Sequence, residues 1–128
     1  MKTRIGYHHI EYEDWIQVLL EEEPEALTIH GRTRDEMSLV PTHWDVIGEI
    51  AHLVKSKWKS NCLVIGNGDV KTLEEADEKV CVYGVDGIMF GRALFGNPWL
   101  FQRSRDAVSV EERFQGLIHH TRNFEVCC

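Results

Sequence analysis

The sequence has no long apolar run and no apolar leader. Its longest apolar stretches, such as Leu63–Ile65 and Gly87–Phe90, are far shorter than the roughly 20 residues that a membrane-spanning helix needs. The first residues become polar by His8, so the apolar core of a secretory signal is missing too. We therefore expect no membrane segment and a cytoplasmic location.

Cysteine and net positive charge are also scarce. The four cysteines, Cys62, Cys81, Cys127 and Cys128, contain no CxxC pair and are too few for a disulfide scaffold, which predicts reduced thiols and no metal site. The net charge is −7, whereas binding nucleic-acid phosphates usually requires a concentrated basic surface. This segment alone is expected to bind RNA poorly, and its small cation clusters fit solvated surface charge better.

The 128 residues have the composition of one soluble globular domain, with 43% hydrophobic and 27% charged residues. Short apolar runs alternate with longer stretches that have helical spacing, which indicates repeated βα units. The first expected strand ends at Arg4, and the others cover residues 26–30, 62–65 and 87–90. Such near-continuous apolar runs are typical of parallel strands that are covered on both faces.

Capping residues mark the expected helices. Thr72 and Glu75 form a capping box that opens a helix to about Tyr83, with Gly84 in the left-handed position that follows it. Thr42 is expected to cap an earlier helix. The apolar stripe of that helix consists of Trp44, Ile47, Ile50, Ala51 and Val54.

Two more helix starts are expected near the end of the chain. Asn97-Pro98-Trp99 has the pattern of an N-cap followed by proline at the first helical position. Ser109 with Glu112 opens a last helix, and its apolar face contains Phe114, Leu117 and Ile118. Four βα units can form a small open sheet or half of an eight-stranded barrel, and periodicity does not distinguish these two folds.

Polar residues follow each expected strand, at the sheet edge where parallel α/β proteins bind ligands. They are Lys2 and Arg4, His30–Arg34, Gly66–Asp69 and Gly91–Arg92. The glycines let backbone N–H groups approach a phosphate, and Arg92 offers a planar cationic fork. The same glycines also fit tight turns that bind nothing.

Lys2 and His30 are expected to project from adjacent strands toward one mouth, where both can hydrogen-bond a polar heterocycle. A lysine beside the N1–C2=O edge of a flavin stabilises the charge that reduction places there. A lone histidine at a strand end is nonetheless often structural, so His30 by itself does not identify a site.

The motifs together resemble the tRNA-dihydrouridine synthases, most closely the bacterial type. The resemblance covers Lys2 to about Phe101 and rests on five segments in the same order, namely Lys2–Gly6, Leu27–Arg34, Ile65–Asp69, Gly87–Arg92 and Gly96–Phe101. It implies the C-terminal half of a (β/α)₈ TIM barrel: residues 1–103 would form a partial FMN-binding barrel, and 104–128 would begin a helical C-terminal region.

The resemblance also implies roles for individual residues. Lys2 would hydrogen-bond the isoalloxazine ring of FMN, and His30 would also contact FMN. Arg32 and Arg34 would face the tRNA. The ribityl and phosphate groups would be held by Asn67, Gly68, Asp69, Gly91 and Arg92. In the family reaction, NADPH reduces FMN, the flavin delivers hydride to C6 of an extruded uridine, and a cysteine protonates C5.

The sequence departs from the family in three ways. The Asn-x-Gly-Cys-Pro segment that carries the catalytic cysteine does not occur, so no residue of this chain is assigned a catalytic role. Ala93 stands where the family commonly has glycine. The first half of the barrel is missing, which would leave exposed sheet edges and an open interior face. We therefore expect the chain alone to be inactive and to dimerise, aggregate or lack a stable fold.

Three other functions stay open at this point. One is a different FMN barrel, such as a dihydroorotate dehydrogenase-like enzyme, although residues 30–34 and 96–101 speak against it. Another is a phosphate-binding barrel without redox chemistry. The last is a non-catalytic RNA-binding or interaction remnant, which the negative net charge disfavours.

Overall fold

A computed structural model describes residues 1–103 and 108–127, with side chains described to residue 124. The strands are β1 (Lys2–Arg4), β2 (Ala26–His30), β3 (Leu63–Asn67) and β4 (Gly87–Met89). The helices are α1 (Tyr12–Glu21), α2 (Trp44–Ser56), α3 (Leu73–Tyr83), a short 3₁₀ helix η1 (Arg92–Leu94) and α4 (Val110–Cys127).

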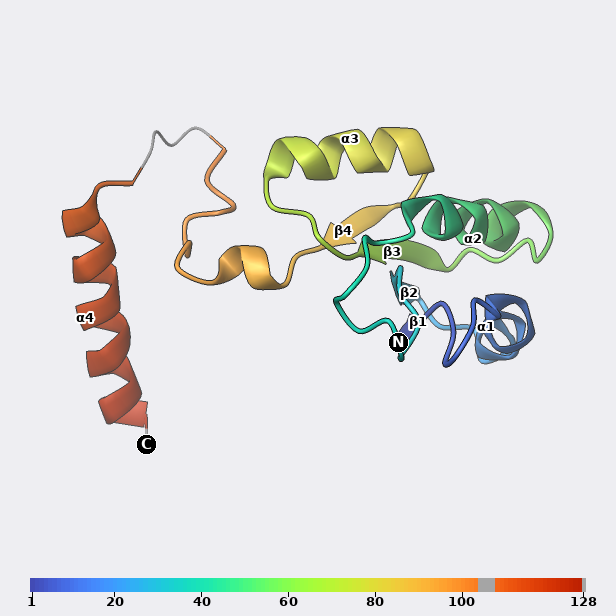
Figure 1. Cartoon of the computed structure of the whole chain (residues 1–128), viewed down its shortest axis with the longest axis horizontal. Helices are drawn as coiled ribbons and strands as arrows, with labels where there is room; N and C mark the ends of the chain where they lie inside the picture. Colours follow the sequence, from blue (N-terminus) through green and yellow to red (C-terminus); the bar gives the residue numbers. More distant parts are fainter. Residues whose placement is uncertain (104–107, 128) are drawn as a thin grey trace.

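The four strands form one parallel sheet in the order β1-β2-β3-β4. Each strand pairs with the next one in sequence, and α1, α2 and α3 connect them along one side of the sheet (Figure 1). A doubly wound open sheet would place helices on both faces, whereas helices on one face and sequential order are typical of a barrel wall. The expected fold class, part of a (β/α)₈ barrel, is confirmed.

The core lies between the sheet and these helices. Leu27 and Ile29 of β2 and Val64 of β3 are fully buried, and they belong to the same apolar cluster as Ile47 and Ile50 of α2. The alternate strand residues point to the other face, where Leu63 is 50% and Met89 41% exposed. The strands were expected to be covered on both faces, but within the described chain only the helix side is closed.

The expected helix caps are confirmed at two helices. The Thr72 hydroxyl accepts a hydrogen bond from the N–H of Glu75 at 3.1 Å, and Gly84 follows α3 with a left-handed φ of 65°. Before α4, Ser109 and Glu112 exchange backbone-to-side-chain bonds of 3.0 and 3.2 Å. These caps rest on local hydrogen bonds, which explains why the sequence alone predicts them.

The prediction that Thr42 caps α2 is wrong. The N-cap of α2 is His43, which makes no side-chain cap bond. The Thr42 hydroxyl instead donates to Oδ2 of Asp69 at 3.0 Å, so a contact with the loop after β3 replaces the local one. The apolar stripe of α2 is confirmed, because its five residues are all buried.

The helix expected at Asn97-Pro98-Trp99 does not form either. Successive turns cover this segment, with bonds from Leu100 N–H to the Asn97 carbonyl (3.3 Å) and from Gln102 N–H to the Trp99 carbonyl (2.9 Å). Leu100 is buried, and the ring of Phe101 meets Phe90 edge-on at 5.7 Å between centroids. These tertiary contacts hold the chain in turns rather than in a helix.

The last helix, α4, stands apart from the sheet (Figure 1). Phe114, Leu117 and Ile118, expected to form its apolar face, are all exposed. Gly116 of α4 lies beside the ring of Trp99: a Cβ added at Gly116 would be 3.3 Å from that ring. In the described ranges, none of the helices is both long and apolar enough to cross a membrane.

Candidate functional site

A pocket of about 760 Å³ opens at the carboxyl ends of the strands. This volume is within the range of small-molecule and cofactor sites. Four of its lining residues lie on a single rung of the sheet, because the register pairs Arg4 with His30, His30 with Asn67, and Asn67 with Met89. The parallel register therefore brings one side chain from each strand to the same mouth.

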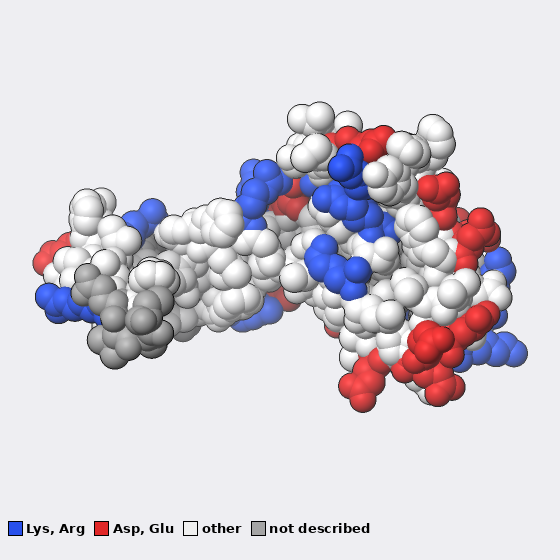
Figure 2. Space-filling view, turned by 90° about the horizontal axis from the view of Figure 1, so that it is seen from below, with Lys and Arg blue, Asp and Glu red and all other residues white. Residues whose placement is uncertain are grey.

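The pocket has a cationic lining despite the negative net charge of the chain. Arg4, Arg32, Lys71 and Arg92 contribute to it, against Asp69 and Glu75. Figure 2 shows Lys and Arg side chains gathered near the middle of the body that contains the sheet, with Asp and Glu mainly toward its margin. Because local charge rather than net charge attracts a ligand, the pocket is suited to an anion.

Most of the residues selected from the sequence line this pocket. They are His30, Arg32, Asn67, Gly68, Asp69, Gly91 and Arg92. Lys2 and Arg34 do not line it. Lys2 pairs with Thr28, two residues before the Arg4–His30 pair, and so lies on the same face of the sheet but farther from the strand ends. Its positive charge still lowers the pKa of His30. Its own pKa is lowered by burial and by the neighbouring charge of Arg4.

Arg4 of β1 lines the pocket, although it was not among the site residues predicted from the sequence. It follows Lys2 by two positions, so both project from the same face of β1, but Arg4 is the one at the strand end. Its Nη1 donates to the carbonyl of Thr33 at 2.8 Å, which links β1 to the loop after β2. The period-two spacing from Lys2 was the signal that could have identified it.

The loop after β3 turns sharply at Gly68 and Asp69. Gly68 has a φ of 135° and Asp69 a φ of 56°, both in the left-handed half of φ space. The indole N–H of Trp44 donates to the Gly68 carbonyl at 3.1 Å. A Cβ at Gly68 would lie 2.5 Å from the hydroxyl oxygen of Thr42, so only glycine fits this approach.

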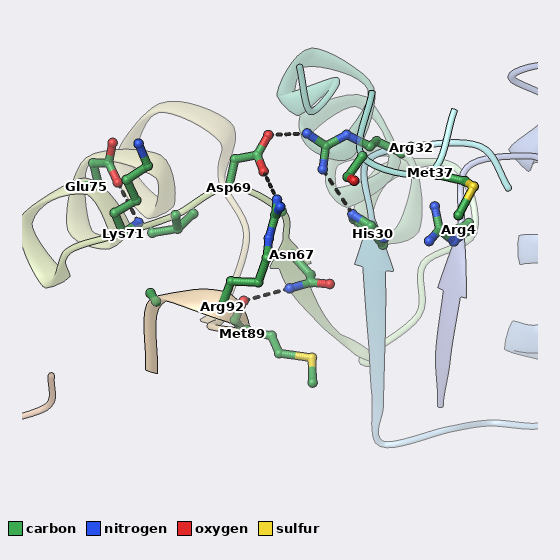
Figure 3. Close-up of a pocket in the computed structure, with 15 residues that line it drawn as sticks. Arg4, His30, Arg32, Met37, Asn67, Asp69, Lys71, Glu75, Met89 and Arg92 are labelled. Atoms are coloured by element: carbon green, nitrogen blue, oxygen red, sulfur yellow. Dashed lines mark hydrogen bonds and ion pairs between the residues drawn. The ribbon is translucent and has the colours of Figure 1, made fainter. Parts of the chain in front are cut away.

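Asp69 connects two arginines across the pocket (Figure 3). Its Oδ1 accepts from Nη2 of Arg92 at 2.9 Å, and its Oδ2 accepts from Arg32 and from the Thr42 hydroxyl. Burial alone would raise the pKa of Asp69. The hydrogen bonds from Arg32 and Thr42 and the charges of both arginines outweigh it, so the pKa lies below its usual value.

Arg32 is buried, with 3% of its side chain exposed. Its Nε donates to the Val40 carbonyl at 2.7 Å, its Nη2 to Asp69, and its Nη1 lies 3.5 Å from Nε2 of His30. The sequence had assigned both Arg32 and Arg34 to the tRNA side. In the structure Arg34 is the exposed one, with its guanidinium 5.5 Å from the centre of the Tyr7 ring.

His30 lies among positive charges. Its pKa is lowered to about 4, first by burial and then by the charges of Arg4, Lys2 and Arg32, while Asp69 acts in the opposite direction. The ring is therefore neutral at pH 7.

We expect His30 to make the folded chain less stable as the solution becomes acidic. The unfolded chain binds a proton at His30 near pH 6.5, whereas the folded chain binds one only near pH 4. Between these values the unfolded state holds more protons, so this contribution is complete above pH 6.5 and is lost as the pH falls toward 4. The urea midpoint at pH 7 and pH 5 measures it.

His30→Gln should reduce the difference between the two midpoints. His52→Gln, at an exposed position on α2, is the control and should leave it as in the wild type. Equal differences in wild type and His30→Gln would show that His30 accepts a proton as readily in the folded chain as in water.

The pocket can bind an anionic, partly apolar ligand, with Met37 and Met89 supplying apolar wall. Its described lining contains no cysteine. Cys62 directly precedes β3, at the strand's opposite end, and Cys81 lies on α3. Neither of these two thiols lines the pocket.

Comparison with known proteins gives one consistent result. The model of the dihydrouridine synthase family matches residues 1–127. A protein of Staphylococcus epidermidis named probable tRNA-dihydrouridine synthase is 39% identical over 126 residues, which cover 98% of this chain and 38% of that protein. Probable tRNA-dihydrouridine synthase 2 of Bacillus subtilis is 38% identical over 113 residues, covering 88% of this chain and 34% of its own length.

The chain thus spans little more than a third of the length of these relatives. The match covers all four strands and every residue of the pocket. The resemblance noted from the motifs is confirmed: the chain belongs to the dihydrouridine synthase family.

Proposed function

We propose that this chain forms the phosphate-binding part of an FMN-dependent tRNA-dihydrouridine synthase, which reduces uridine in tRNA to 5,6-dihydrouridine with NADPH. The observation that carries the proposal is the convergence of Arg4, His30, Asn67 and Met89 on one rung, beside the paired Asp69 and Arg92. The names of the relatives favour tRNA over the substrates of other flavin barrels.

The residues present fit the cofactor. Arg92 is 68% exposed, so its guanidinium can leave Asp69 and bind a phosphate. At Gly91 nothing lies within 4 Å of the position of a Cβ, which leaves the backbone open to a ligand. Arg92 and Gly91 would hold the phosphate, and Asn67, Gly68 and Asp69 would line the ribityl region.

The ring end of the cofactor would lie toward β1 and β2. His30 would contact the isoalloxazine ring, and Lys2, deeper on the same face, would stabilise negative charge on it. When bound, the flavin supplies hydride to the substrate. The protein's own contribution is to orient the ring and fix the charges around it. The exposed Arg34 would contact tRNA, whereas the buried Arg32 would contribute its charge to the wall of the pocket.

The segment must be tested in a chain of full length. We expect a chimera, in which these residues replace the matching segment of the Staphylococcus epidermidis relative, to bind FMN and to form dihydrouridine in tRNA with NADPH. Arg92→Ala in the chimera should weaken FMN binding about tenfold to a hundredfold, because a charge-assisted phosphate contact contributes about 1.5–3 kcal/mol. Fluorescence titration of FMN measures the affinity.

Arg103→Ala is the matched control, since Arg103 pairs with Asp77 outside this pocket. It should leave the FMN affinity unchanged. Lys2→Ala should also lower flavin affinity. If neither Lys2→Ala nor Arg92→Ala alters the flavin content, the site assignment is wrong. A chimera that binds FMN but leaves tRNA unmodified would favour another flavin-barrel function.

We also propose that the chain alone is inactive and self-associates. β1 and β4 are sheet edges of three residues each, and the face opposite the helices presents exposed Leu63 and Met89. In sedimentation velocity we expect dimers or larger species. Leu63→Asp should shift the distribution toward monomer, whereas Leu39→Asp, at a loop position that is 84% exposed, should not. A wild-type monomer that melts cooperatively would refute this proposal.

We propose that residues 1–103 are the barrel part and that 104–128 begin a helical region; α4 supports the second half, while the boundary at 104–107 lies outside the described residues. The cytoplasmic location likewise stays a prediction.

A further inference from the structure

The buried guanidinium of Arg32 contacts a backbone carbonyl, a carboxylate and an imidazole ring. Of these three groups, only the imidazole can carry its hydrogen on either of two nitrogens. Nε and Nη2 are committed to the Val40 carbonyl and the Asp69 carboxylate. Nη1 remains for the His30 ring, with Nε2 at 3.5 Å. Figure 3 shows Arg32 between the other two side chains, with one dashed contact to Asp69 and another to His30.

We propose that Arg32 is a positioning residue that fixes His30 as a neutral imidazole with its hydrogen on Nδ1. As a consequence, His30 offers an N–H donor to the pocket ligand, so the group that meets Nδ1 must be an acceptor, such as a carbonyl oxygen or an unprotonated ring nitrogen. Only the identity of that ligand rests on the proposed function.

The direction of the contact follows from the chemistry of arginine. All five N–H groups of a guanidinium are donors and none of its nitrogens accepts, so a hydrogen on Nε2 would face a hydrogen on Nη1. The distance of 3.5 Å makes the bond weak, but it leaves the lone pair of Nε2 as the only favourable partner. The single hydrogen of a neutral ring must then lie on Nδ1.

The surrounding charges keep the ring in its neutral form. Lys2 and Arg4 face it from β1 and Arg32 from the loop after β2, whereas Asp69, from the loop after β3, is the acidic group that acts on it. A second hydrogen would add a positive charge beside three others, partly away from water. Among the described residues, none accepts a hydrogen bond from Nδ1, so this donor is available to a ligand.

The chain labelled with ¹⁵N-histidine tests the inference without any flavin. Long-range ¹H–¹⁵N spectra at pH 7 distinguish a protonated ring nitrogen from an unprotonated one, and His30→Gln identifies the His30 signals. If the chain associates, the same ¹⁵N shifts can be measured on the sedimented solid. We expect Nδ1 protonated and Nε2 unprotonated. A hydrogen on Nε2, or on both nitrogens, would overturn the proposal.

Two substitutions separate positioning by Arg32 from the rest of the environment. Arg32→Met removes every hydrogen-bond donor at this position, so His30 should shift toward the Nε2–H form that free histidine prefers in water. Arg32→Gln is a second, uncharged variant with the same expected shift. Arg34→Lys is the control and should leave the wild-type signals. Persistence of Nδ1–H in both Arg32 variants would show that Arg32 does not set the tautomer.

These results are independent of the proposed function. The expected tautomer in a chain whose chimera fails to bind FMN would sustain this inference and reject the flavin. The opposite tautomer with normal FMN binding would reject only the role of Arg32.

Discussion

Replacing Asp69 with alanine is expected to lower the free energy of unfolding by about 3 kcal/mol. The substitution leaves Arg32 buried without its carboxylate partner, and an uncompensated buried charge is among the most costly defects in a protein. The value is at the lower end of the range for buried pairs because Asp69 itself is partly exposed. Urea denaturation at pH 7 measures it, with wild type and variant compared at the same chain concentration because the chain is expected to self-associate.

A surface pair of the same chemistry provides the control. Asp77 accepts two hydrogen bonds from Arg103, but both side chains are more than half exposed. Asp77→Ala should therefore change the urea midpoint little. If Asp69→Ala and Asp77→Ala had equal effects, the burial of Arg32 would carry no energetic weight, and its role in positioning His30 would lose its basis.

Gly68→Ala is expected to destabilise the chain by on the order of 3 kcal/mol, from two separate causes. A φ of 135° is a conformation that residues with a Cβ rarely adopt. The added methyl would also lie 2.5 Å from the Thr42 hydroxyl oxygen, so either the loop after β3 or the segment before α2 must move. The urea midpoint and thermal melting both report the change.

Gly91→Ala is the matched substitution in the next loop. Gly91 has a φ of −128°, and nothing lies within 4 Å of the position of its Cβ. Its unfolding free energy should stay near the wild-type value. Thr42→Ser combined with Gly68→Ala should recover part of the loss, because it removes the methyl group that contributes to the clash. Equal stability of the two glycine variants would mean that the turn at Gly68 relaxes without cost.

The sequence predicted features that depend on neighbouring residues in the chain. The caps at Thr72 and Ser109 need only a hydroxyl and a carboxylate three residues apart. The full box formed at Ser109, whereas at Thr72 the hydroxyl cap formed but the Glu75 carboxylate accepts from the N–H of Lys71 instead. The four strands were found with ends displaced by up to two residues. The pocket followed from one general rule, that parallel strands place their carboxyl ends at one edge.

Features that depend on distant residues were not predicted. The local sequence predicts Thr42 as a helix cap, but in the structure its hydroxyl donates to Asp69 instead. Arg32 and Arg34 are equivalent in sequence, yet one is buried and the other exposed, because Val40, Asp69 and His30 surround only the first. No local pattern carries that information, since the partners lie up to 37 residues away.

Arg4, His30, Asn67 and Met89 share one rung only in the observed strand register. Ligand binding therefore depends on correct alignment of the strands. If β1 slipped by one residue against β2, Arg4 would turn toward the helix layer and Thr3 or Ile5 would take its place at the mouth. Such a slip in one three-residue strand could leave most of the apolar core intact. A misaligned molecule would then keep its shape in bulk measurements yet lose its ligand, so binding is the stricter assay of correct folding.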